Sequence, residues 1–107
     1  MLSQYNPLEP STVPVLLASE AQDDFRHVLM QAEREGGDAQ RAAIDDALDH
    51  ALTTLSANPN GGVARPDLAD NVRMKPVGDY CLFYESHPKA VFVLRILHRS
   101  HDAQASY

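Results

Sequence analysis

The chain has 107 residues, and its 15 acidic residues outnumber its nine lysines and arginines, which gives a formal net charge of −6 at pH 7. This length suffices for one domain with a modest core and is too short for two. The sequence contains no run of about 20 apolar residues, which argues against a membrane span. Its first ten residues lack the basic and apolar parts of a secretory signal, and its single cysteine, Cys81, cannot form an intrachain disulfide. We therefore expect a cytoplasmic protein.

The charge is distributed unevenly along the chain. Residues 1–53 carry ten acids and three arginines, whereas residues 54–107 carry five acids and six lysines or arginines. A chain that is acidic overall is repelled by nucleic acid, but its second half alone can present a local basic surface.

The first half predicts a strand followed by two helices. Residues 1–12 contain Pro7 and Pro10 and little periodicity, so we expect a flexible N-terminal extension. Val13–Leu17 is a short apolar run that favours a strand. Ser19–Gln22 has the form of a capping box, with Ser19 as the N-cap of a helix.

Two apolar stripes at helical spacing follow, separated by Gly36 and Gly37. The first stripe consists of Ala21, Phe25, Val28, Leu29 and Ala32, and the second of Ile44, Ala47, Leu48, Ala51, Leu52 and Leu55. Asp38 can cap the second helix, and the breaker Asn58–Gly62 ends it. The pattern predicts an antiparallel helical hairpin, in which Leu48 and Leu55 pack onto a sheet.

After the hairpin the pattern changes to that of strands. Val72–Val77, Tyr80–Glu85 and Val91–His98 are predicted strands separated by turn signals. Val91–His98 is nearly continuous in apolar content, which favours a central position. The fold class is therefore α+β, with an N-terminal strand, an α-helical hairpin and then a three-stranded antiparallel meander. We expect a single domain over residues 13–103 and a tail over 104–107.

The chain lacks the sequence motifs of common catalytic, nucleotide-binding and zinc sites. Asp45, Asp46 and Asp49 favour a solvated acidic helix face over a metal site. Cys81 favours a structural role, and Tyr80 and Tyr84 share one face of a strand, where aromatic side chains usually pack. His98 and His101 are three residues apart, but at the end of a predicted strand and not on a helix, so we expect neither a metal nor a cofactor.

A group of basic side chains at the end of the predicted central strand is more informative. Its members are Arg95, His98, Arg99 and His101, together with Arg73 and Lys75 on a preceding strand. Such a group suits an anionic partner, either phosphate or an acidic peptide segment. We add Tyr84 to these six as a candidate binding residue.

The order of motifs from Leu55 onward resembles the ParE/RelE superfamily of bacterial toxins, with residues 13–103 covered. The motifs are Leu55, Asn58, Pro59 and Gly62; Arg65–Leu68; Val72 and Arg73; Gly78–Tyr80 and Tyr84; and Val91 with Val93–Ser100 and Asp102. The ending Val93–His98 with Ser100, Asp102 and Ala103 is most similar to the ParE, or plasmid-stabilisation, branch.

The resemblance implies the RelE/ParE-like fold and the toxin part of a type II toxin–antitoxin system. A cognate ParD-like antitoxin would neutralise the toxin by laying an extended or helical, often acidic and apolar, segment over its sheet and helices. The pair would form a hetero-oligomer, and DNA would be bound only through that complex. ParE members inhibit DNA gyrase by binding, without catalytic residues.

The alternatives are a RelE-like ribosome-dependent endoribonuclease that cleaves mRNA, and an inactive relative that acts as a binding module. In the RNase reading, the resemblance implies Arg73, Arg95, Arg99 and His101 as catalytic residues. RelE-type enzymes are strongly basic and carry an arginine where this chain has Cys81 after Tyr80. These departures favour inhibition by binding over RNA cleavage.

Overall fold

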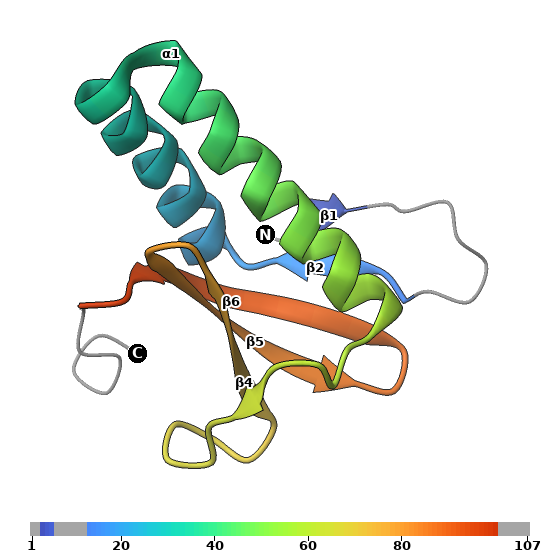
Figure 1. Ribbon diagram of the computed structural model, residues 1–107. Helices are drawn as coiled ribbons and strands as arrows, with labels where there is room; N and C mark the ends of the chain where they lie inside the picture. Colours follow the sequence, from blue (N-terminus) through green and yellow to red (C-terminus); the bar gives the residue numbers. More distant parts are fainter. Residues whose placement is uncertain (1–2, 6–12, 101–107) are drawn as a thin grey trace.

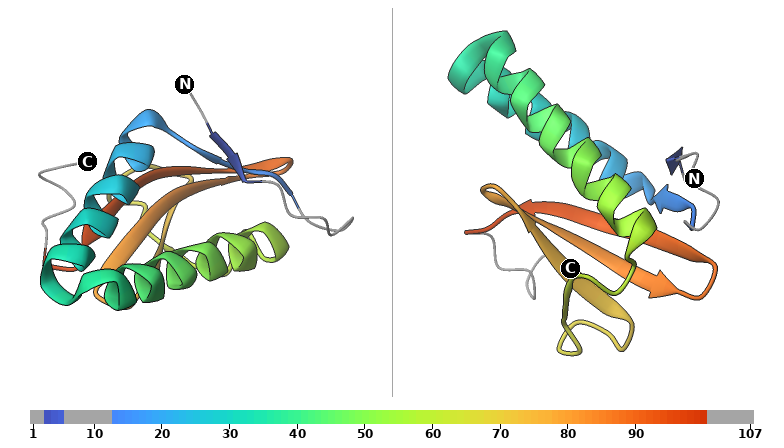
Figure 2. Two further views of the ribbon diagram at one scale, coloured as in Figure 1. Left: turned by 90° about the horizontal axis from the view of Figure 1, so that it is seen from above. Right: turned by 45° about the vertical axis from the view of Figure 1, so that its right-hand side comes forward.

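The helical layer is a hairpin formed by one long element, α1 (Ser19–Ala57), which reverses direction at Gly37 (Figure 1). The computed structural model describes residues 3–5 and 13–100. Gly37 is the non-helical residue inside α1, with φ of 72° and ψ of −162°, a conformation that strongly favours glycine. The predicted hairpin is therefore present, and its two arms diverge from the tip when seen from above (Figure 2).

The start of the hairpin differs by one residue from the prediction. Ala18 is the N-cap and Ser19 already lies in the helix, so the expected capping box with Ser19 as N-cap is wrong. The Gln22 side chain instead donates from Nε2 to the Leu17 carbonyl at 3.1 Å, and the Ala18 backbone nitrogen donates to Val93 at 2.9 Å. Backbone contacts with the sheet thus fix where the helix begins.

The sheet has six strands in the order β1-β2-β6-β5-β4-β3. They are β1 (Ser3–Tyr5), β2 (Val15–Leu17), β3 (Val63–Ala64), β4 (Val72–Val77), β5 (Tyr80–His87) and β6 (Ala90–His98). β4, β5 and β6 form the predicted antiparallel meander, and β6 lies inside the sheet as expected. β2 pairs with β6 in parallel, so the sheet is mixed.

Two short strands were not predicted. β3 pairs with β4, and β1 pairs with β2 inside the segment that we expected to be a flexible extension. The remainder of that extension, residues 1–2 and 6–12, lies outside the described residues, as does the expected tail 104–107.

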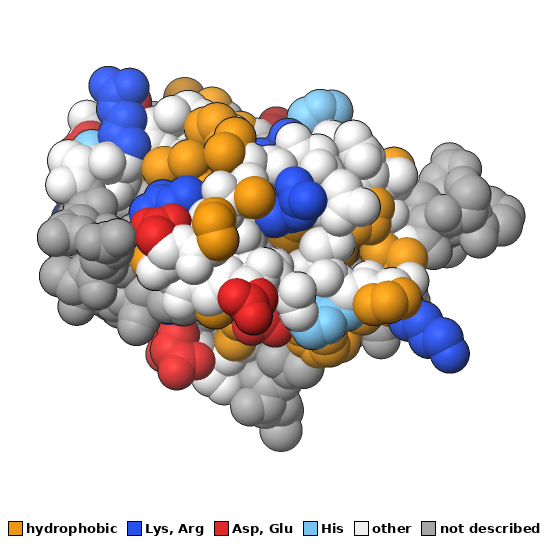
Figure 3. Space-filling model, turned by 90° about the horizontal axis from the view of Figure 1, so that it is seen from below, with side chains coloured by type: hydrophobic (Ala, Val, Ile, Leu, Met, Phe, Trp, Pro, Cys, Tyr) orange, Lys and Arg blue, Asp and Glu red, His pale blue; other side chains and the backbone are white. Residues whose placement is uncertain are grey.

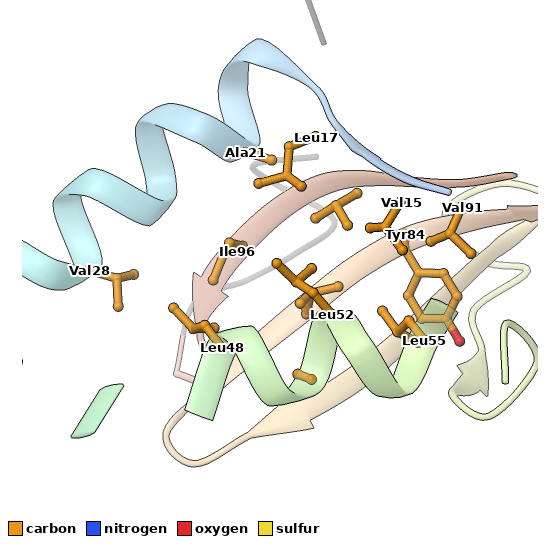
Figure 4. Close-up of a cluster of buried hydrophobic side chains, with 13 residues drawn as sticks. Val15, Leu17, Ala21, Val28, Leu48, Leu52, Leu55, Tyr84, Val91 and Ile96 are labelled. Atoms are coloured by element: carbon orange, nitrogen blue, oxygen red, sulfur yellow. The ribbon is translucent and has the colours of Figure 1, made fainter. Parts of the chain in front are cut away.

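A single apolar core fills the space between the hairpin and one face of the sheet (Figure 4). Its buried members from α1 are Ala21, Val28, Leu48, Ala51, Leu52 and Leu55, and those from the sheet are Val15, Leu17, Leu82, Tyr84, Val91, Val93 and Ile96. Most residues of the predicted stripes therefore contribute to this core, whereas Ala47 is exposed.

A β-bulge in β6 sets which side chains face the hairpin. Phe83 pairs with Arg95 and Tyr84 pairs with Val93, so Leu94 is an extra residue without a partner position in β5. Strict alternation would place Val93 and Ile96 on opposite faces, yet both lie in the core beneath the hairpin. The extra residue Leu94 shifts the alternation of side chains by one position, so that Val93 and Ile96 face the same side of the sheet.

We predict that Leu48→Ala and Leu55→Ala each lower the free energy of unfolding by about 2–5 kcal/mol, because each leaves a cavity in the core. Both side chains are only 1% exposed. Urea unfolding followed by circular dichroism measures the loss. Met30→Ala is the control in the same hairpin, since Met30 is 45% exposed. A loss well below 1 kcal/mol for either leucine would refute the packing of this arm on the sheet.

Candidate partner-binding site

The basic side chains that the sequence placed in one group have different surroundings in the structure. Arg95 forms a two-pronged ion pair with Asp24 of α1, with Nε to Oδ2 at 2.7 Å and a terminal nitrogen to Oδ1 at 3.1 Å. Asp24 Oδ2 also accepts the backbone N–H of Ile96 at 2.9 Å. The hydrogen bonds that Arg95 donates to Asp24 raise the pKa of Arg95, against the opposing effect of burial. Arg95 therefore joins the hairpin to the bulged strand.

Arg73 holds the loop that follows the hairpin. Its guanidinium donates to the carbonyl of Gly62 at 2.8 Å and to that of Asn60 at 3.2 Å. The Ser86 hydroxyl, on the neighbouring strand, bonds to the Asn60 side chain at 2.9 Å. Loop carbonyls near the C-terminal end of α1 are thus bonded to the sheet through a charged donor.

Tyr84 belongs to the core, because its side chain is fully buried against Leu55 and Val91 (Figure 4). Its hydroxyl accepts the backbone N–H of Gly62 at 2.9 Å. A Cβ at Gly62 would lie 2.6 Å from that hydroxyl, so the close approach requires glycine. Burial raises the pKa of Tyr84, and the Gly62 bond and Arg73 partly oppose this. Tyr84 therefore supports the loop from inside and does not reach the surface.

The remaining candidates lie nearer the surface. Lys75 is half-buried on β4. His98 is exposed at the end of β6, where its ring meets the Tyr80 ring edge-on at 5.5 Å between centroids. The Arg99 side chain is 69% exposed, and its guanidinium lies 3.6 Å from the Asp79 carboxylate. His101 lies outside the described residues.

His98 also lines a pocket between the hairpin and the end of the sheet. The pocket has a volume of about 470 Å³ and is open on one side. Its walls come from both arms of α1 and from β5, β6 and the β4–β5 turn: His27, Val28, Gln31, Glu35, Gln40, Ile44, Asp79, Tyr80 and His98. The arms of α1 extend past the sheet at this end (Figures 1 and 2).

The pocket combines an apolar floor with a negative rim. Val28 is buried, and Ile44 and Tyr80 pack against the core. Burial raises the pKa of the Tyr80 hydroxyl, and the carboxylates of Glu35 and Asp79 raise it further. Both carboxylates therefore act on the same small region. Gln31 donates to Glu35 at 3.0 Å.

The opposite face of the sheet is not covered by α1, the helix of the described residues, and it is partly apolar (Figure 3). A second cluster joins buried Phe83 and Leu97 to Leu68, Met74 and Cys81, with the Arg65 guanidinium 5.8 Å from the centre of the Phe83 ring. Cys81 is half-buried there, which agrees with the structural role expected for it.

The same face continues on β2 and β6. Leu16 and Phe92 alternate with core residues along their strands, so they point away from the hairpin, and both are half-buried. The His87 ring packs edge-on against Phe92 at 5.2 Å. This face is a second surface on which a partner could dock.

The acidic group Asp45, Asp46 and Asp49 lies on the second arm of α1. Partial burial, followed by the charges of Asp45 and Asp46, raises the pKa of Asp49. In residues 3–5 and 13–100, no three His, Cys, Asp or Glu side chains converge in a way that could hold a metal ion.

The sequence prediction missed most of the pocket. His27, Gln31 and Glu35 follow one another at four-residue spacing, so they share one side of the first arm. That polar row could have been recognised in the sequence. Its convergence with Asp79 could not, because it depends on how far the hairpin extends past the sheet.

The architecture defines a small α+β protein in which a helical hairpin covers one face of a sheet and leaves the other face open. Residues 15–103 match the family described as the ParE toxin of the type II toxin–antitoxin system parDE, and the chain belongs to this family of toxins. An antitoxin is the partner that membership implies.

Among solved structures, the chain is similar in fold to a chain of the chromosomal ParDE toxin–antitoxin system from P. aeruginosa. The TM-score is 0.65 and the sequence identity is 17%, with 77% of this chain and 90% of that chain covered. No curated protein sequence matches the chain. In the part of the chain that the structure describes, no helix has the length and apolar character needed to cross a membrane.

We predict that Asp24→Ala lowers the free energy of unfolding by about 1–3 kcal/mol, because it leaves the half-buried Arg95 and the Ile96 N–H without this acceptor. The Asp24 side chain is 15% exposed. Asp23→Ala is the matched control one residue earlier, since its ion pair with Arg26 is exposed on both sides. Urea unfolding should separate the two variants, and equal losses would contradict the role of Asp24.

Proposed function

We propose that this toxin acts by binding and inhibiting DNA gyrase, and that a cognate antitoxin neutralises it in the cytoplasm. The observation that carries the proposal is the engagement of Arg73 and Arg95 in contacts within the fold. Both arginines are among the residues that an RNA-cleaving relative would use as catalytic groups.

Metal-free cleavage of RNA requires cations placed around the phosphate to stabilise the charge that develops in the transition state. Arg95 is bound on two prongs by Asp24, and Arg73 is directed at two loop carbonyls. Releasing either cation toward a phosphate would disrupt the contact between hairpin and strand or the loop. The net charge of −6 also opposes binding to a ribosome, which is largely RNA. Inhibition by binding requires neither free catalytic arginines nor attraction to RNA.

The antitoxin would bind across the pocket and the open sheet face, giving a hetero-oligomer that reaches DNA only through its antitoxin. The pocket offers an apolar floor with polar walls, and the sheet face offers Leu16 and Phe92. Both features are typical of surfaces that another chain covers.

We predict that the purified chain inhibits supercoiling by DNA gyrase and increases the amount of cleaved DNA held by the enzyme. It should not cut mRNA on translating ribosomes. In cells, induced expression should activate the DNA-damage response before protein synthesis falls. Reactions without the chain are the control for each assay. Cleavage of ribosome-bound mRNA without any effect on gyrase would refute gyrase inhibition and support the RelE-like alternative. No effect in either assay would favour the inactive relative.

We predict that Arg99→Ala weakens toxicity or affinity for the antitoxin by about tenfold, because a charged hydrogen bond to a partner contributes about 1.5–3 kcal/mol. Its stability should hardly change, since the contact with Asp79 is long and exposed. Lys89→Ala is the control: it removes the same charge from the exposed β5–β6 turn. Full toxicity and full antitoxin affinity in Arg99→Ala would exclude this residue from the binding surface.

A further inference from the structure

We infer that the pocket between the hairpin and the end of the sheet binds a basic side chain, arginine or lysine, of a partner segment that is otherwise apolar. Identification of that partner as the antitoxin rests on the proposed function. The preference of the pocket for a basic side chain does not rest on the proposed function, because it follows from the residues that line the pocket. The resemblance to the superfamily instead leads one to expect an acidic segment.

The hairpin carries the whole net charge of the protein. α1 contains nine acidic residues and three arginines, which gives −6, while the remainder of the chain holds six acidic residues and six lysines or arginines. A segment that covers the hairpin therefore enters a negative field. An acidic segment would be repelled there, and a basic one attracted.

The pocket concentrates this field at two carboxylates from different elements. Glu35 comes from the first arm of α1, and Asp79 from the turn between β4 and β5. Both act on the hydroxyl of Tyr80, which lies between the core and the pocket. A cationic group near Tyr80 would thus meet two negative charges, where an anionic group would meet repulsion from both.

The apolar floor specifies the remainder of the ligand. Val28, Ile44 and Tyr80 form a surface that suits the methylene stem of arginine or lysine, whose charged head then reaches the carboxylates. The volume of about 470 Å³ exceeds that of one side chain, so neighbouring apolar residues of the segment can enter as well.

Contacts already made by these carboxylates do not block such a ligand. Gln31, which bonds to Glu35, is neutral, and Arg99 approaches Asp79 only at 3.6 Å with both side chains about two-thirds exposed. A ligand cation can therefore replace Arg99 at Asp79 at little expense in stability.

The test uses two peptides that differ in one charge, acetyl-Leu-Arg-Leu-amide and acetyl-Leu-Glu-Leu-amide. Each is titrated into the ¹⁵N-labelled full chain at pH 7.5 and low salt, and amide chemical shifts are followed. The arginine peptide should shift the amides of His27, Tyr80 and His98 and bind at least about tenfold more tightly than the glutamate peptide. Binding should weaken as salt is added. Equal affinities, or shifts that avoid the pocket, would overturn the inference.

Two double variants separate the pocket from the general charge of the hairpin. Glu35→Gln with Asp79→Asn should abolish the preference for the arginine peptide, whereas Asp46→Asn with Asp49→Asn should keep it. Both change the net charge equally, and Asp46 and Asp49 lie outside the pocket lining. Equal effects of the two double variants would show that only the overall field matters and would overturn the site.

A third variant tests the chain's own residues 101–107 as the occupant. Removal of these residues should leave peptide binding unchanged, and a clear gain in affinity would show that they compete for the pocket and would overturn the inference. If the full chain proves neither toxic nor inhibitory to gyrase but still prefers the arginine peptide, the proposed function alone is refuted. The two failures are therefore distinguishable.

Discussion

The bulge at Leu94 is the constraint on which the arrangement of hairpin and sheet depends. Without the extra residue, a strand that places Val91 and Val93 under the hairpin would turn Ile96 to the opposite face. With it, all three contribute to the core. The same distortion leaves the Ile96 N–H directed at Asp24, beside the Arg95 guanidinium. One irregularity in β6 therefore completes the core and creates the polar contact that joins it to α1.

This use of Arg95 has a consequence for function. Arg95 is bound at two nitrogens by the Asp24 carboxylate, and Arg73 is bonded to loop carbonyls. The charge of both side chains is therefore largely satisfied within the fold. Among the described residues of this basic group, His98 and Arg99 at the end of β6 remain largely exposed to a partner. Two of the six basic residues in the group, Arg73 and Arg95, are thus structural cations of the fold.

The elements with strong periodicity could be predicted from the sequence, and those that depend on distant pairing could not. The arms of α1 and the strands β4 to β6 follow from local patterns that their packing reinforces. β1 and β3 are only three and two residues long, and each is defined by its pairing with one neighbouring strand. Ala18 likewise became the N-cap because the backbone at this point bonds to β6.

The surroundings of the candidate site residues also could not be predicted from the sequence, for a different reason. Tyr84 and Tyr80 were correctly predicted to share a face, but the sequence could not tell that the first would be buried and the second would border a pocket. That difference arises because the arms of α1 diverge and continue past the sheet, so the core ends before the hairpin does (Figure 2). Glu35 of α1 and Asp79 of the β4–β5 turn then line a recess. The sign of the charge in that recess is a property of this chain's side chains, so it can distinguish between partners that the fold alone does not distinguish.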